Sequence, residues 1–132
     1  MGLFNRTRKP LPPYDTMNRE IDFLEKLAKA YQKYDASIIE DELADDMHYA
    51  SLWVFHEITS KQEYLDYLKS KLQTMKNAGT THDFQIVDGW MHSKALLITK
   101  IDGCDDNDGG FVVDFNDKGK VKMLNITIPD FF

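Results

Sequence analysis

The sequence predicts an α+β fold, in which helices pack on one face of an antiparallel sheet. Apolar residues recur at helical spacing in the first half of the chain, over residues 18–34 and 61–75. After residue 79 the pattern changes to short runs typical of strands. The last two runs, at residues 111–116 and 121–128, flank a tight turn and form the clearest hairpin in the chain.

Composition and length indicate one compact domain after an N-terminal arm. The chain has 132 residues, of which 42% are hydrophobic and 29% are charged, enough for a substantial core. Residues 1–17 contain three of the four prolines and show little periodicity. We therefore expect an extended arm over residues 1–17 and an α+β domain over residues 18–132.

Charge and hydropathy argue against two classes of binding partner, nucleic acid and membrane. The net charge of −6 argues against nucleic acid, because phosphate binding needs a concentrated basic surface. No run approaches the ~20 apolar residues of a membrane span, and the N-terminus lacks the apolar region of a signal peptide. The single cysteine, Cys104, has no partner for an internal disulfide. These features predict a cytoplasmic protein that binds neither nucleic acid nor membrane.

Two helices are expected before the first strand. The first, over residues 18–34, is followed by a break at residues 35–37, and Ser37 is placed to cap a short helix over residues 38–43. The first helix carries one apolar stripe, formed by Ile21, Leu24, Leu27, Ala28, Tyr31 and Tyr34.

The central stretch predicts a strand and then a capped helix. Residues 46–55 alternate, and both sets of side chains are largely apolar, so we expect both faces of this strand to be covered. Ser60 and Glu63 form a capping box, while Asn77 and Gly79 mark the end of the helix. The side chains expected on one face of the strand are Met47, Tyr49, Ser51, Trp53 and Phe55, and those on the helix stripe are Tyr64, Leu65, Leu68, Leu72 and Met75.

The remaining strands are expected at residues 82–91, 94–101, 111–116 and 121–128. Alternation places Phe111, Val113, Phe115, Leu124, Ile126 and Ile128 inside, and Val121, Met123, Asn125 and Thr127 outside. The strand at residues 94–101 has two faces that are both too apolar to sit fully in water, so we predict a homodimer through the outer sheet face.

Four segments of the sequence, together with the order of the elements, match a known pattern: residues 34–37, 43–46, 61–75 and 114–121. Together they resemble the nuclear-transport-factor-2-like superfamily, also called SnoaL-like, over about residues 18–128. The resemblance implies a cystatin-like cone, in which a curved antiparallel sheet wraps around the N-terminal helix and a second long helix. It also implies a small-molecule pocket in the open end of the cone, and homodimers in many members.

The catalytic residues known in that superfamily are not matched. Its ketosteroid isomerases use a tyrosine and two aspartates, which the resemblance places at Leu27, Ser51 and Phe111. Leucine and phenylalanine donate no hydrogen bond, and an unactivated serine is a poor base at neutral pH. Its epoxide hydrolases use an Asp–Arg–Asp centre, but the arginines here lie in or just after the arm: Arg6, Arg8 and Arg19.

The polar groups left for the pocket favour binding over catalysis. They are hydroxyl and indole groups on apolar or aromatic side chains, which suit a small apolar or aromatic molecule. We expect no cofactor and no catalytic residue. Residues of these types at helical or strand spacing also fit a simple core, so both interpretations stay open for Tyr31, Tyr34, Tyr49, Ser51 and Trp53.

Two other functions are compatible with the sequence. The chain could be a lyase-type or isomerase-type enzyme that uses Tyr49 or a histidine at position 48, 56, 82 or 92. It could also be a protein-interaction domain whose own side chains fill the pocket.

No metal site is expected. The acidic turn at residues 105–110 would need ligands at Gly109 and Asn116 that neither can supply as an EF-hand loop requires. His56-Glu57 is not followed by a histidine at helical spacing, so the zinc-protease pattern fails as well.

Overall fold

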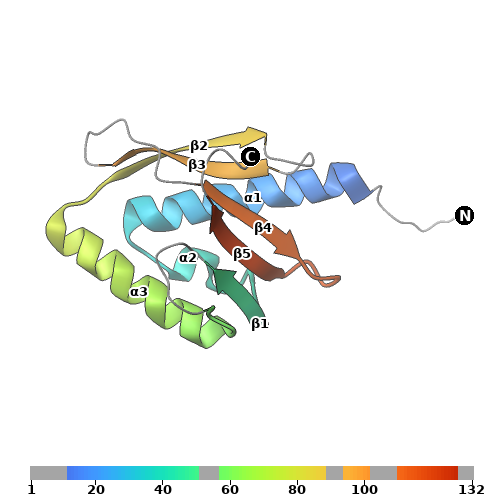
Figure 1. The fold of residues 1–132 in the computed structure, drawn as a ribbon, viewed down its shortest axis with the longest axis horizontal. Coiled ribbons are helices and arrows are strands. Elements are labelled where there is room, and N and C mark those ends of the chain that lie inside the picture. The colour runs from blue at the N-terminus through green and yellow to red at the C-terminus, as the bar shows by residue number, and fades with distance from the viewer. Residues whose placement is uncertain (1–11, 51–56, 89–93, 102–109, 128–132) are drawn as a thin grey trace, which may run out of the picture.

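The structure is a computed structural model that describes residues 12–50, 57–88, 94–101 and 110–127 (Figure 1). Its elements in chain order are α1 (Pro12–Lys33), α2 (Ser37–Glu40), β1 (Leu43–Ala50), α3 (Lys61–Ala78), β2 (His82–Asp88), β3 (Lys94–Ile101), β4 (Gly110–Phe115) and β5 (Val121–Thr127). The α+β fold class is confirmed.

The five strands form one sheet in the order β1-β5-β4-β3-β2. The pairs β2–β3, β3–β4 and β4–β5 are antiparallel, whereas β1 and β5 run parallel. The sheet is therefore mixed rather than wholly antiparallel. Strands joined by a short turn must run antiparallel, but β1 and β5 lie far apart in the sequence, so no turn fixes their direction.

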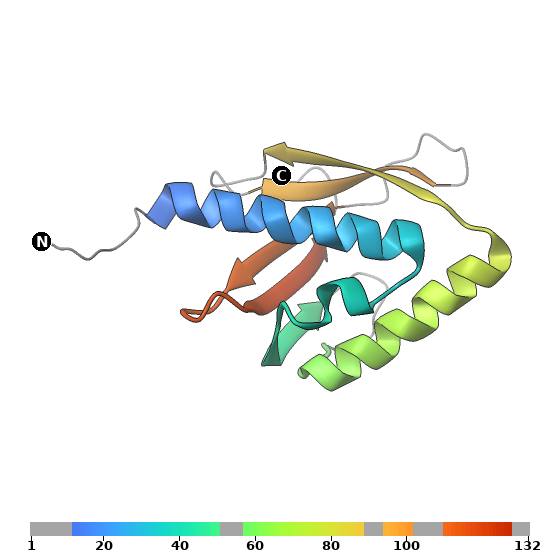
Figure 2. The ribbon, with the colours of Figure 1, turned by 180° about the vertical axis from the view of Figure 1, so that it is seen from behind.

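The sheet curls without closing, and the two long helices lie on it at different places. Helix α1 packs against β2, β3 and β4, while α3 packs against β1. Figures 1 and 2 show α1 running along the sheet and α3 crossing below it, on the side of β1. In the ranges that the structure describes, no helix is long and apolar enough to cross a membrane.

Helix α3 follows the sequence prediction closely. The Ser60 side chain accepts a hydrogen bond from the Glu63 backbone N–H at 3.1 Å, which caps the helix. Gly79 ends it with a φ of 72°, a left-handed conformation that glycine adopts without steric cost. The buried side chains of α3 are those of the predicted stripe: Tyr64, Leu65, Leu68, Leu72 and Met75.

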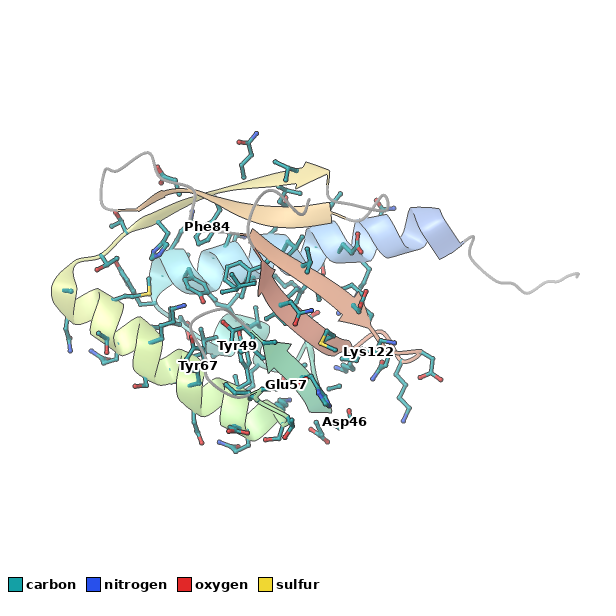
Figure 3. The ribbon with its side chains drawn as sticks, viewed as in Figure 1. Asp46, Tyr49, Glu57, Tyr67, Phe84 and Lys122 are labelled. Atoms are coloured by element: carbon teal, nitrogen blue, oxygen red, sulfur yellow. The ribbon has the colours of Figure 1, made fainter. Side chains whose placement is uncertain are left out.

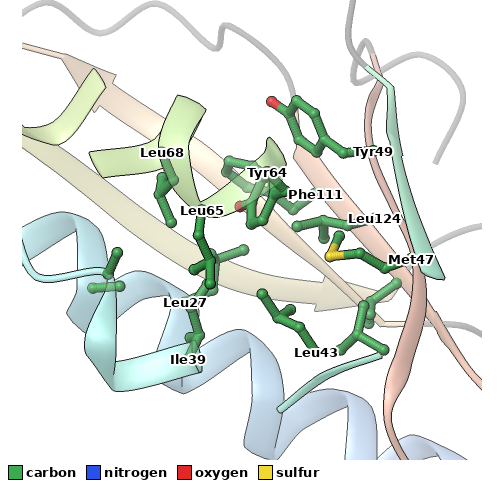
Figure 4. Packing of buried hydrophobic residues seen from close by; sticks show 14 of the residues in the cluster. Leu27, Ile39, Leu43, Met47, Tyr49, Tyr64, Leu65, Leu68, Phe111 and Leu124 are labelled. Carbon is green, nitrogen blue, oxygen red and sulfur yellow. The ribbon is translucent and has the colours of Figure 1, made fainter. Parts of the chain in front are cut away.

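The core lies between the helices and the inner face of the sheet (Figure 4). On the two C-terminal strands, the predicted inward residues Phe111, Val113, Leu124 and Ile126 are buried. Ile128 lies outside the described residues. On β1, Met47 and Tyr49 are buried as expected.

The prediction that Val121 faces outward is wrong, because its side chain is fully buried. Asp114 pairs with Met123, but the next residue, Phe115, pairs with Val121, so a bulge adds one residue to β5. A bulge reverses the alternation beyond it, and turns Val121 toward the core.

Two helix starts also differ from the prediction. Helix α1 begins at Pro12 rather than residue 18, so the last six residues of the expected arm are helical. Proline is tolerated in a first turn, where the missing N–H would have no partner inside the helix. Ser37 does not cap α2, because its N–H and Oγ donate to the Asp35 carboxylate at 3.0 and 2.7 Å. These hydrogen bonds lower the pKa of Asp35.

Strand β1 is also less covered than expected. It is the edge strand of the sheet, and the His48 side chain on its second face is 44% exposed. Apolar side chains on both faces of a strand predict cover only where the fold supplies a second layer.

A charged junction ties α1 to the start of β1 and to the β4–β5 turn. The Arg19 guanidinium donates to Glu42 Oε1 at 2.7 Å and to the Gly119 carbonyl at 2.8 Å, and it lies 4.6 Å from the centre of the Phe115 ring. Lys26 Nζ donates to Glu42 Oε2 at 3.2 Å. Burial raises the pKa of Glu42, but the hydrogen bonds and charges of Arg19 and Lys26 outweigh it, and the pKa is lowered.

Candidate functional site: a buried tyrosine cluster beside a lysine

Three tyrosines of β1 and α3, Tyr49, Tyr64 and Tyr67, are in mutual ring contact, and Lys71 links them to Tyr31 of α1; we call these four tyrosines the tyrosine cluster. Tyr64 and Tyr67 lie on one side of α3, since residues three apart in a helix are neighbours. The ring centre of Tyr49 is 4.9 Å from that of Tyr64 and 5.4 Å from that of Tyr67. Figures 3 and 4 show these rings between β1 and α3.

Tyr31 closes the cluster from the side of α1. Its ring centre lies 5.5 Å from that of Phe111 and 5.7 Å from that of Phe84, so aromatic walls surround it. Lys71 of α3 joins Tyr31 to the rest, because its Nζ lies 5.4 Å from the Tyr31 ring centre and 5.8 Å from that of Tyr67. Cations are attracted to aromatic faces at such distances.

The phenols of Tyr31 and Tyr64 are neutral hydrogen-bond donors at physiological pH. Burial, and then the neighbouring phenols, raise the pKa of Tyr31 and of Tyr64 well above the ordinary value. Within the described part of the chain, the buried Tyr64 hydroxyl has no hydrogen-bond partner.

The five residues predicted from the sequence do not all fall in this cluster. Tyr31 and Tyr49 are in it, with 3% and 1% of their surface exposed. Tyr34 is not, because its hydroxyl donates to the Thr80 carbonyl at 2.6 Å and fastens the end of α1 to the start of β2. Ser51 and Trp53 lie outside the described residues.

Tyr34 has a backbone role as well. Its φ of 54° is in the left-handed region, where it ends α1, and the Asp35 N–H returns to the Ala30 carbonyl at 2.8 Å. The conformation and contacts of Tyr34 are therefore explained by its role at the end of α1, and they require no ligand.

Sequence reasoning missed three contributors. It assigned Tyr64 to the core stripe and singled out neither Tyr67 nor Lys71. The available signal was the spacing: Lys71 follows Tyr67 by four residues, which places both side chains on one flank of the stripe.

A buried acid was also missed, but it lies elsewhere. Glu20 is 3% exposed and has contacts of its own. It precedes Tyr31 on α1 by about three turns, roughly 16 Å along the axis, so it is not part of the tyrosine cluster. A lone acidic residue on a predicted surface helix gives no sequence signal of burial.

Two of the four histidines lie among the described residues. His48 Nδ1 contacts Glu57 Oε2 on the outer side of β1, and both side chains are 44% exposed. His82 packs its ring edge-on against Tyr31, with 5.9 Å between ring centres. His56 and His92 lie outside the described residues. In the described ranges, no three side chains of His, Cys, Asp or Glu come together as a metal site.

Two surface grooves are formed by other residues. One, of about 710 Å³, lies between β1 and the β4–β5 turn, and charges of both signs line it, among them Asp41, Asp45, Asp46, Lys118, Lys120 and Lys122. The other, of about 340 Å³, lies between α1 and β2 and includes Phe84 and Ile86. Neither groove is lined by the predicted site residues.

Comparison with known proteins places the fold. No family model and no curated protein matches the sequence. Among solved structures, a SnoaL-like protein of unknown function from Burkholderia thailandensis E264 superposes with a TM-score of 0.67 and 15% identity, covering 89% of this chain and 98% of its own. A protein proposed to be an isomerase of the SnoaL-like family, from Agrobacterium tumefaciens strain C58, has a TM-score of 0.61 and 14% identity, covering 84% and 99%.

A third similar structure is an uncharacterised cystatin-fold protein from Novosphingobium aromaticivorans, with a TM-score of 0.56 and 11% identity over 81% of this chain and 96% of its own. At these identities the likeness concerns the fold alone. The curled sheet around two long helices and the likeness over nearly the whole described chain lead to one conclusion: this protein has the cystatin-like fold of the SnoaL-like, nuclear-transport-factor-2-like proteins.

Proposed function

We propose that the protein binds a small apolar or aromatic molecule at the tyrosine cluster, and that it does so without the catalytic residues of its fold relatives. The observation that carries the proposal is the Tyr64 hydroxyl, which is buried and without a hydrogen-bond partner among the described residues. An unpaired buried hydroxyl costs about 1–3 kcal/mol, and a bound molecule with an acceptor oxygen removes that cost.

The aromatic surroundings support the same proposal. The rings of Tyr31, Tyr49 and Tyr64 supply flat apolar surface, and their hydroxyls supply a few placed polar groups. Ligand sites combine these two features in the same way.

The chemistry of the cluster suits binding more than proton transfer. A general base needs a pKa near the working pH, but burial moves the pKa values of Tyr31 and Tyr64 further above it. His82 supports the second candidate, a lyase-type or isomerase-type enzyme, since its ring contacts Tyr31. An enzyme of that kind would lose turnover in His82→Gln while keeping its ligand.

A thermal-shift screen of apolar and aromatic metabolites tests the proposal. A ligand at one hundred times its dissociation constant adds about 2.7 kcal/mol to the free energy of unfolding. The stabilisation should shrink in Tyr64→Phe and persist in Tyr34→Phe, whose phenol is engaged by Thr80. If no compound stabilises the protein, the third interpretation, an interaction domain filled by its own side chains, replaces this one.

The same proposal includes a homodimer through the outer sheet face and a cytoplasmic location. The outer side chains Val112, Met123 and Asn125 are half-buried within one chain and form a continuous strip across β4 and β5. Sedimentation of a monomer at micromolar concentration would contradict the dimer.

A further inference from the structure

Lys71 and three tyrosines of the cluster, Tyr31, Tyr64 and Tyr67, carry donor groups without a matching acceptor among the described residues. Beyond their ring contacts, their side chains form no hydrogen bond or ion pair with any described residue. Phenols can share hydrogen bonds with one another, but an ammonium group only donates.

Lys71 is the decisive member of this set. It is half-buried, and its Nζ lies beside two aromatic rings rather than beside a carboxylate. Other lysines of the described chain show the alternative, since Lys26 reaches Glu42 at 3.2 Å and Asp22 at 3.5 Å. A cation that is partly removed from water and has no counter-ion favours an anion beside it.

The position of Lys71 also brings that charge close to the tyrosines. Lys71 lies one turn after Tyr67 on α3, and its Nζ lies 5.8 Å from the Tyr67 ring centre and 5.4 Å from that of Tyr31. The Tyr67 ring centre is in turn 6.4 Å from that of Tyr64, whose buried hydroxyl has no hydrogen-bond partner among the described residues. One positive charge and one unpaired phenol therefore lie among the same group of aromatic rings.

We propose that the ligand of this site is a small aromatic carboxylate, with its ring among the aromatic side chains of the cluster and its carboxylate oxygens accepting from Lys71 and the Tyr64 hydroxyl. This inference rests on the proposed function and names the chemical class that the site takes. Charge-assisted hydrogen bonds of this kind are about twice as strong as neutral ones, which gives selectivity over uncharged molecules of the same shape.

The test compares two probes of matched shape, 1-naphthoate and 1-naphthamide, by isothermal titration calorimetry at pH 7. The full chain should bind the carboxylate at least tenfold more tightly than the amide. Lys71→Met keeps the aliphatic stem but removes the charge, so it should abolish that preference without weakening amide binding. Lys71→Arg should retain the preference.

Lys69→Met is the matched control, because Lys69 is exposed on the same helix and, two residues from Lys71, does not share its face. It should leave both affinities unchanged. Circular dichroism checks that each variant is folded, and the unchanged amide affinity of Lys71→Met shows that its site is intact.

The outcomes separate this inference from the proposed function. Equal affinities for the two probes, or a preference that survives in Lys71→Met, would overturn the carboxylate inference while leaving a small-molecule site in place. Failure of both probes together with every compound of the apolar screen would overturn both proposals.

Discussion

Tyr64→Phe should make the free protein more stable, which is unusual for a substitution in a core. The Tyr64 side chain is fully buried and its hydroxyl has no partner among the described residues. Removing that hydroxyl removes a desolvation cost of about 1–3 kcal/mol and leaves only a small void, so we expect a gain of about 1 kcal/mol.

The matched control is Tyr34→Phe, which makes the same chemical change with the opposite expected sign. The Tyr34 hydroxyl donates to the Thr80 carbonyl at 2.6 Å, and its loss should destabilise the protein by about 1 kcal/mol. Urea unfolding followed by circular dichroism gives both free energies, and the two midpoints of thermal unfolding should lie about 6–10 °C apart.

A loss of stability in Tyr64→Phe as large as that in Tyr34→Phe would refute this reasoning, because it would show that the Tyr64 hydroxyl is satisfied in the free protein. A gain of stability combined with weaker ligand binding would show that the Tyr64 hydroxyl destabilises the free protein and contributes to ligand binding.

Three further predictions concern the scaffold. Glu42→Gln should destabilise the protein by about 1 kcal/mol because it weakens the hydrogen bonds from Arg19 and Lys26, whereas Asp22→Asn, at a half-exposed position, should change little. Since the folded pKa of Glu42 is below its unfolded value, the contribution of Glu42 is complete above the unfolded pKa and is lost as the pH falls through the folded one; the wild-type advantage over Glu42→Gln in urea midpoint should therefore vanish in acid. Ser60→Ala should lower the free energy of unfolding by about 1 kcal/mol, because it removes the cap of α3. Ser70→Ala, at an exposed position within the same helix, should be neutral or slightly stabilising. Equal effects of the two substitutions in chemical unfolding would rule out the cap. Val121→Ala should lower the free energy of unfolding by about 2 kcal/mol, and Met123→Ala should lower it clearly less. The reverse order in thermal unfolding would contradict the bulge in β5.

The sequence was enough for the elements that depend on local rules. Helix α3 carries its own start at Ser60, its stop at Gly79 and its apolar stripe, and the structure reproduces all three. The burial of Phe111, Val113, Leu124 and Ile126 on β4 and β5 followed in the same way, because alternation along an unbulged strand is a local property.

The tertiary structure alone decided the direction of β1 against β5, the burial of Val121 and the membership of the site. A parallel pair between distant strands and a bulge are chosen by packing against the rest of the fold, which no local pattern encodes. The tyrosine cluster depends on the same long-range packing: Tyr31, Tyr49, Tyr64 and Lys71 come from three different elements, and only the closure of α3 over β1 and α1 brings their side chains together.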